Sequence, residues 1–146
     1  MPIVVRRIPD RMAALGAAAR YLAGRQPFAS FTAGSFIGTL AGQVGRGHCL
    51  FALDGLAVRG YLGWALLDTA EAERFARTGA PPPDAACRGR DVVWLLTAAT
   101  DSALALKALL AAGRAEYPGL RVMGTRHKPG GRRVVFSQHI PRRSSA

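Results

Sequence analysis

The dipeptide Asp54-Gly55 constrains the fold most strongly, because it joins two extended apolar runs, 48–53 and 57–66. A two-residue Asp-Gly connection suits the left-handed backbone of a tight hairpin turn. In these two runs, apolar residues either alternate with other residues or follow one another without interruption. Such patterns are expected of strands that are buried on one face or on both faces. This part of the chain is therefore predicted to form a β-hairpin.

Pro129-Gly130-Gly131 provides a second hairpin signal, between the runs 120–127 and 132–139. A fifth strand is predicted over 91–98, at the start of the sequence DVVWLLTAATD. That run is almost wholly apolar, which is typical of a strand buried on both faces. Histidine, cysteine and a carboxylate in mid-strand are all absent from it.

Helical periodicity predicts four helices, each beginning after a residue suited to cap it or after a change of pattern. The predicted helices cover residues 11–24, 30–44, 69–79 and 103–117. The apolar residues of the first helix, Met12, Leu15, Ala19 and Leu22, recur at helical spacing and form one stripe. In the second helix, Phe31, Phe36, Ile37 and Leu40 are expected to face inward. The caps are expected at Asp10, Asp68 and Asp101-Ser102.

The resulting order is α-α-β-β-α-β-α-β-β. Hairpins interleaved with helices predict an α+β fold, with a largely antiparallel sheet flanked by helices. This arrangement resembles the acetyltransferase-like (GNAT-like) fold.

The chain has 146 residues, of which 49% are hydrophobic. One domain over residues 1–140 is expected, followed by a flexible basic tail, 141–146. Cys49 and Cys87 are too few for a disulfide framework and lack metal-ligand spacing, so no metal site is expected. No apolar run reaches the roughly 20 residues that span a bilayer. A soluble protein of the reducing cytoplasm is the expectation.

The formal net charge of +11 indicates an acidic partner or a solvated basic surface. After Glu116 the sequence has no acidic side chain, while arginines and lysines accumulate. The second hairpin should gather Arg121, Arg126, Lys128, Arg132 and Arg133 on one ribbon. An acidic protein is favoured over nucleic acid, because only one aromatic residue, Phe136, is available nearby to stack on bases.

Recognisable catalytic or nucleotide-binding motifs are missing. The glycines of GTLAGQVG lack the Lys-Ser/Thr pair of a phosphate-binding loop and do not follow a strand. His48, His127 and His139 are scattered beside or within predicted strands. Each is expected to be a surface residue or a packed, hydrogen-bonded one.

From Leu15 to Ile140, several features coincide in order with those of a known enzyme family. They are Leu15-Gly16 in the first helix, Phe36 in the second, a strand–turn–strand with Tyr61 that ends at Trp64, Gly89 before the strand with Ala98, Ala105-Leu106, the Tyr117-Pro118 helix stop, Arg126 and Pro129. The spacing from Leu15 to Trp64 matches without a gap. On these residues the chain resembles the RTX-toxin-activating lysine acyltransferases.

The resemblance implies an acetyltransferase-like fold and the transfer of a fatty acyl group to internal lysines of a protein such as an RTX-type protoxin. It also implies that the acyl donor is an acyl carrier protein, with no bound cofactor. Because acyl carrier proteins are strongly acidic, Arg126, Lys128, Arg132 and Arg133 are the expected carrier-protein-binding residues. Pairing among members of the family suggests a homodimer.

The family's chemistry is attributed to a histidine after the first helix and an aspartate in the middle strand. These positions correspond here to Phe28 and Leu95, and neither side chain can accept a proton. Shifting the first alignment by one residue gives Pro27 or Ala29, and the family's preceding serine falls on Arg25. The usual His/Asp pair is therefore replaced.

Two interpretations of this replacement stay open, in addition to a nucleic-acid-binding protein. The chain can be an acyltransferase that works through other groups, of which Thr97, Asp91 and His48 are the substitutes to test. It can instead be a catalytically inactive homologue that binds a carrier protein, an acyl chain or another protein. In either case Trp64 and Trp94 are candidate residues of an acyl-binding groove.

Overall fold

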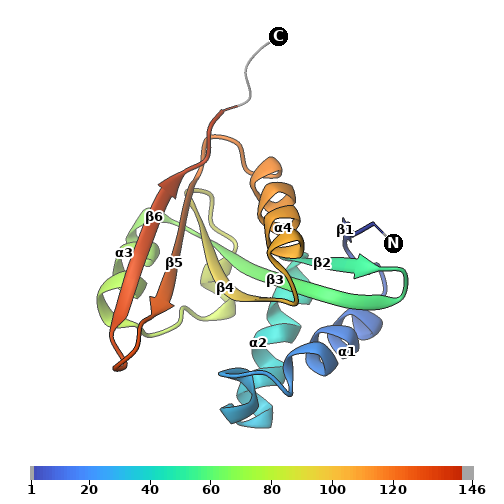
Figure 1. The fold of residues 1–146 in the computed structure, drawn as a ribbon. Helices are drawn as coiled ribbons and strands as arrows, with labels where there is room; N and C mark the ends of the chain where they lie inside the picture. Colours follow the sequence, from blue (N-terminus) through green and yellow to red (C-terminus); the bar gives the residue numbers. More distant parts are fainter. Residues whose placement is uncertain (1, 143–146) are drawn as a thin grey trace. The chain divides into compact units, whose positions relative to one another are not determined.

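The computed structural model describes residues 2–142, and its strands form one six-stranded sheet in the order β1-β2-β3-β4-β5-β6 (Figure 1). The strands are β1 (Val4–Arg6), β2 (Cys49–Asp54), β3 (Ala57–Leu67), β4 (Val92–Thr100), β5 (Arg121–His127) and β6 (Arg133–His139). The α-helices are α1 (Arg11–Leu22), α2 (Ala33–Arg46), α3 (Thr69–Thr78) and α4 (Ala103–Ala115). Two short 3-10 helices, η1 (Phe28–Ser30) and η2 (Asp84–Cys87), complete the elements.

The sheet is mixed, because β4 and β5 are parallel whereas β1–β2, β2–β3 and β5–β6 are antiparallel. Both predicted hairpins are present, with positive φ at Gly55 in the first turn and at Gly130 and Gly131 in the second. The predicted α+β fold with an acetyltransferase-like sheet is confirmed.

The chain forms two compact units. The first unit contains the residues up to Gly63 together with Thr97–Gly113. The second contains Trp64–Leu96 and the chain from Arg114 onward. The boundary of a domain at residue 140 stays a prediction, and the tail residues 143–146 lie outside the described part.

In the first unit, α1 and α2 share one core with β2 and β3. Ala14, Ala18 and Leu22 of α1 are almost fully buried in it. On the opposite face, α4 approaches Gly60 of β3 so closely that an added β-carbon would lie 2.9 Å from Leu109. Successive β3 residues therefore contact helices on alternating sides, as the pleat of a strand requires.

The predicted helix faces needed correction at three residues. Met12 is 75% exposed, Phe31 48% and Ile37 40%. Phe31 precedes α2, whose cap is Thr32, so it does not belong to the helical stripe. Met12 lies outside the narrower α1 stripe that faces the core, where small alanines allow close packing.

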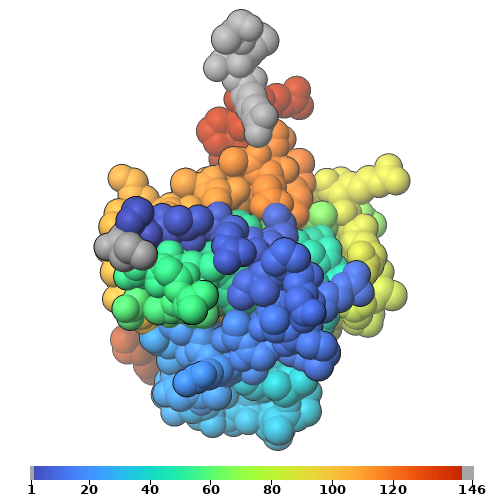
Figure 2. All heavy atoms as spheres, turned by 90° about the vertical axis from the view of Figure 1, so that its right-hand side faces the viewer, coloured from blue at the N-terminus to red at the C-terminus, as the bar shows by residue number. Residues whose placement is uncertain are grey.

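The strand β1 was not predicted, because three residues carry too little periodicity to identify a strand. It pairs with β2 from Val4↔Leu53 to Arg6↔Phe51. Figure 2 shows the dark-blue N-terminal segment lying beside the green β2–β3 hairpin.

In the second unit, α3 packs against β4 and the β5–β6 hairpin. Phe75 of α3 stacks on Trp94 of β4 with ring centroids 4.5 Å apart. Met123 and Val135, from β5 and β6, pack against the same core. None of the helices within residues 2–142 has the length and hydropathy needed to cross a membrane.

Candidate functional site

A buried chain of hydrogen bonds crosses the first unit from α2 to two strands. The Tyr61 hydroxyl donates to Gln43 Oε1 at 2.7 Å, and Gln43 Nε2 donates to Thr97 Oγ1 at 2.9 Å. All three residues are buried, with Gln43 and Tyr61 at 0% exposure. In an apolar core such groups stabilise the fold only while each keeps its partner.

Gly63 has no side chain that would overlap with Gln43 in this chain of hydrogen bonds. A β-carbon at residue 63 would lie 1.8 Å from Gln43 Oε1, well inside contact distance. Glycine is therefore required at this position because of the lack of space. Backbone conformation is not the reason, because the φ of Gly63 lies outside the left-handed region.

Within this chain of hydrogen bonds, the Tyr61 hydroxyl acts as a hydrogen-bond donor. Burial raises the pKa of its phenol well above the ordinary value, and the neighbouring Cys49 thiol raises that pKa further. The phenol therefore stays protonated and cannot serve as a base at neutral pH.

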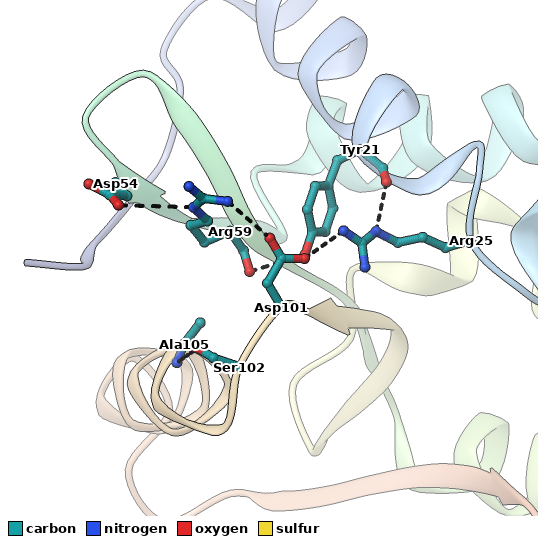
Figure 3. A network of polar contacts seen from close by, with 7 residues as sticks. All are labelled: Tyr21, Arg25, Asp54, Arg59, Asp101, Ser102 and Ala105. Atoms are coloured by element: carbon teal, nitrogen blue, oxygen red, sulfur yellow. Dashed lines mark hydrogen bonds and ion pairs between the residues drawn. The ribbon is translucent and has the colours of Figure 1, made fainter. Parts of the chain in front are cut away.

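A second polar network joins α1, β3 and the turn before α4 (Figure 3). The Tyr21 hydroxyl donates to Asp101 Oδ1 at 2.7 Å and lies 3.0 Å from the carbonyl oxygen of Arg59. Arg25 also donates to Asp101 Oδ1, and Arg59 Nη1 lies 3.6 Å from Asp101 Oδ2. Arg25 covers the Tyr21 ring at 4.1 Å from its centroid.

These contacts keep Asp101 ionised. The hydrogen bond from Tyr21 is the main reason that the pKa of Asp101 lies below its ordinary value, and Arg25 and Arg59 act in the same direction. Burial and the bond to Asp101 raise the pKa of Tyr21 to about 12. A carboxylate with a lowered pKa is a weak proton acceptor, so the network suits binding or orientation better than general-base catalysis.

Of the three proposed catalytic substitutes, Thr97 belongs to the buried chain with Gln43. His48 is also buried, and its Nδ1 accepts a hydrogen bond from Arg46 Nε at 3.1 Å. Because an arginine can only donate, this bond keeps the proton of a neutral His48 on Nε2. The ring nitrogen that would accept a proton is thus already engaged.

Asp91, in the second unit, caps a helix. Its Oδ2 accepts from the backbone N–H of Thr69 at 2.9 Å and from the Thr69 hydroxyl at 3.2 Å. Asp68, the expected cap, makes no side-chain bond within its helix and instead accepts from the N–H of Arg90. Asp68 and Asp91 thus tie the starts of α3 and β4 together reciprocally.

Phe28 and Leu95 stand at the positions that correspond to the catalytic residues of the acyltransferase family that the sequence resembles. Phe28 lies in η1, and its ring packs edge-on against the ring of Phe31. The ring centroids of Phe28 and Phe31 are 5.8 Å apart, and those of Phe28 and Phe36 are 6.4 Å apart. Leu95 pairs with Gly124 of β5. Phe28 belongs to the first unit and Leu95 to the second.

Trp64 and Trp94 both belong to the second unit, and each is only 1% exposed. Trp64 Nε1 donates to the Tyr117 hydroxyl at 2.9 Å, and Trp94 stacks on Phe75. Neither ring presents an open surface in this structure, so their role in an acyl groove stays a prediction.

The cations of the basic hairpin do not form the single surface that the sequence predicted. The register of β5 and β6 places Arg126 and Arg133 on opposite faces. Arg126 lies over the ring of Phe136, 5.1 Å from its centroid. Arg133 donates to the carbonyl oxygens of Phe75 and Ala76 at 3.5 and 2.9 Å.

Arg133 therefore contacts the C-terminal end of α3, where carbonyl oxygens carry partial negative charge. Lys128 and Arg132 are exposed in or beside the turn of the hairpin. Of the four cations proposed to bind a carrier protein, Arg126 is exposed as well, and Arg133 alone is partly buried.

Within residues 2–142, no three His, Cys, Asp or Glu side chains gather as a metal site would require. Both cysteines are buried thiols.

Sequence reasoning missed Gln43, Tyr21 and Arg59. Gln43 gave a signal, because it occupies the inward stripe of α2 with Phe36, Leu40 and Val44. A polar residue at such a position implies a buried partner. Tyr21 and Arg59 gave none, since their network depends on elements far apart in sequence.

Together, the mixed six-stranded sheet and its four α-helices define an acetyltransferase-like fold. Among solved structures, the chain is similar to the GNAT-like decarboxylase GphF in complex with isobutyryl-CoA, with a TM-score of 0.60 and 23% sequence identity. The match covers 88% of this chain and 68% of the decarboxylase chain. No protein-family profile matches the sequence, and no curated protein matches it either.

Proposed function

We propose that this protein is an acyltransferase that moves a fatty acyl group from a thioester to a lysine of a protein substrate, with acyl carrier protein as the donor. The observation that carries the proposal is the acetyltransferase-like fold, which spans 88% of the chain in the comparison with GphF. The solved relative is in complex with an acyl-CoA, which is a thioester of the same chemical class. The resemblance from Leu15 to Ile140 supports lysine as the acceptor.

The reaction requires a neutral lysine amine. Its nitrogen attacks the thioester carbonyl carbon, the C–S bond breaks, and the thiol leaves with a proton. A base that takes the ammonium proton typically contributes about 10²–10⁴ in rate. The Thr97 hydroxyl, the Asp91 carboxylate and the His48 ring each already accept a hydrogen bond within the protein, so transfer is expected to be slow.

A second candidate is a protein of the same fold that binds a carrier protein or its acyl chain without turnover. This candidate is favoured because Phe28 and Leu95 cannot accept a proton. The side chains considered as substitutes for them are already hydrogen-bonded within the protein. The two candidates share the partner and differ only in chemistry, so one assay separates them.

The assay incubates the full chain with acyl carrier protein that bears an isotopically labelled acyl group, and in parallel with the corresponding acyl-CoA. A lysine-rich test protein serves as acceptor, and mass spectrometry measures acyl-lysine. Transfer from the carrier protein above the uncatalysed rate supports the proposal. Tight binding without transfer supports the second candidate, and binding of neither thioester contradicts both.

The variants Thr97→Val, Asp91→Asn and His48→Gln test the three substitutes, with thermal unfolding as the control for structure. The double substitution Phe28→His with Leu95→Asp restores the family's residue types. A gain of transfer in this double variant would show that only the catalytic groups had been lost. Arg132→Glu with Lys128→Glu should weaken carrier-protein binding, and the same variants tested with DNA and RNA address nucleic acid as an alternative partner.

A malonyl thioester belongs in the same assay. Decarboxylation releases CO₂, and the electron pair left on the carbon next to the thioester carbonyl takes up a proton. That chemistry needs a proton donor and no base, so release of CO₂ without acyl transfer would replace the proposal.

A further inference from the structure

The outer edge of β6 (Arg133–His139) is a strand edge that no other strand covers in the described part of the chain. β6 lies at the end of the sheet order and pairs only with β5 (Figure 1). Its residues Ser137 and His139 are exposed. A strand edge carries a row of backbone donors and acceptors that an added strand can use.

The backbone bonds identify which residues face this edge. The N–H of Ile140 donates to Leu120 O, and the N–H of Lys128 donates to Arg132 O. In an antiparallel pair, residues that bond to the neighbouring strand alternate with residues whose N–H and C=O point away from it. The even-numbered residues therefore bond to β5, and Val135, Ser137 and His139 direct their backbone groups outward.

The charges around this edge select its partner. Arg132 lies at one end of β6, Arg142 follows the other end, and Arg121 pairs with His139 across the hairpin. Arg121 also donates to Ser137 Oγ at 2.8 Å, which keeps its charge beside the edge. Neither strand nor the turn between them contains a carboxylate side chain.

We propose that the β6 edge binds an extended acidic segment of a partner protein, which adds as a further strand through backbone hydrogen bonds. Such strand addition obtains its affinity from the backbone and its selectivity from the flanking side chains. Like charges would repel a second copy of this edge, whereas glutamates or aspartates on an added strand would meet arginines at both ends. The proposal concerns an interaction surface and does not depend on acyl transfer.

The test uses the full chain and a fluorescent eight-residue peptide in which Glu alternates with Val or Thr. Fluorescence anisotropy measures binding, and a peptide with Lys in place of every Glu is the control. The acidic peptide is expected to bind at least about tenfold more tightly, with affinity falling severalfold between about 50 and 300 mM salt.

Ser137→Pro tests the outward backbone N–H, and Ser137→Ala is its matched control. Both variants lose the hydroxyl that accepts from Arg121, but only proline removes the N–H. Because that N–H does not bond to β5, an edge strand tolerates the change. The proline variant should bind the acidic peptide at least about tenfold more weakly than the alanine variant.

Should the proline variant fail to fold, peptides methylated at alternate backbone nitrogens decide the question on the wild-type chain. Methylation in one register should abolish binding, and methylation in the other should leave it unchanged. Equal binding of the Glu and Lys peptides, no binding of either, or equal binding by the Pro and Ala variants would overturn the proposal. So would a homodimer that the proline substitution alone dissociates, because the edge would then bind a second copy.

Discussion

The side-chain oxygen of Gln43 occupies the space that a β-carbon of residue 63 would need, 1.8 Å away from it. This relationship joins the last turn of α2 to the centre of β3 in the first unit. It also fixes the position of an amide that bonds to Tyr61 and Thr97.

Gly63→Ala is therefore expected to lower the free energy of unfolding by about 2–4 kcal/mol, because Gln43 must leave its hydrogen bonds or the strand must shift. In a Gln43→Ala background the same substitution should cost less than about 1 kcal/mol. Urea denaturation of the four proteins in this double-mutant cycle measures the coupling. Gly38→Ala is the control, since nothing lies within 4 Å of its added β-carbon in α2. Additive effects at residues 43 and 63 would contradict the prediction.

Gly89→Ala should be among the most destabilising single substitutions in the second unit. A β-carbon there would lie 2.5 Å from the Asp68 nitrogen and 2.6 Å from the Leu67 carbonyl carbon, which are backbone atoms that cannot rotate away. Gly89 N–H also donates to Leu66 O at 2.7 Å, so the two segments cannot separate without losing that bond. We expect a loss of about 3 kcal/mol or more in unfolding free energy. Gly16→Ala, in open space on α1, should be neutral or stabilising by up to about 1 kcal/mol. A Gly89→Ala protein with an unchanged melting temperature would refute the close approach.

Acid should weaken the protein partly through Asp101. Because its pKa in the folded protein lies below the ordinary value of 3.8, its ionised form stabilises the fold. That contribution is present above the unfolded-state pKa and is lost as the pH falls through 3.8 toward the lower folded-state value. Asp101→Asn should therefore flatten the fall in stability between about pH 5 and pH 2, measured as the urea midpoint at each pH. Tyr21→Phe removes the largest cause of the shift and should flatten the same region in part. An Asp101→Asn profile parallel to the wild-type profile would rule out this role.

Arg133 and Arg132 are adjacent in sequence but should differ in their effect on stability. Arg133→Ala removes the donor to two carbonyls at the end of α3, with an expected loss of about 1–2 kcal/mol. Arg132→Ala removes an exposed cation and should change stability by less than about 0.5 kcal/mol. Calorimetric melting of both variants makes the comparison at equal net charge. Equal losses in the two variants would show that charge, and not the helix contact, is responsible.

The elements that have local signals could be predicted from the sequence alone. Asp54-Gly55 and Pro129-Gly130-Gly131 predicted both hairpins, because the conformations of their turns are set by the residues in them. The strand at 91–98 and the helix capped by Ser102 were also predicted, and the Ser102 hydroxyl accepts from Ala105 N–H as expected. Together these local patterns were sufficient for the α+β class.

Which polar groups bond to one another followed from the packing of the elements in three dimensions. Asp68 and Asp91 each have the chemistry of a helix cap, and the approach of α3 to the start of β4 assigned that role to Asp91. Arg133 looked like one surface cation among several until the position of α3 gave it carbonyl partners. Gln43, Tyr61 and Thr97 lie in three separate elements, so no local pattern links them. Hydrogen bonds over such distances in sequence depend on the packing of whole elements, which side-chain periodicity does not encode.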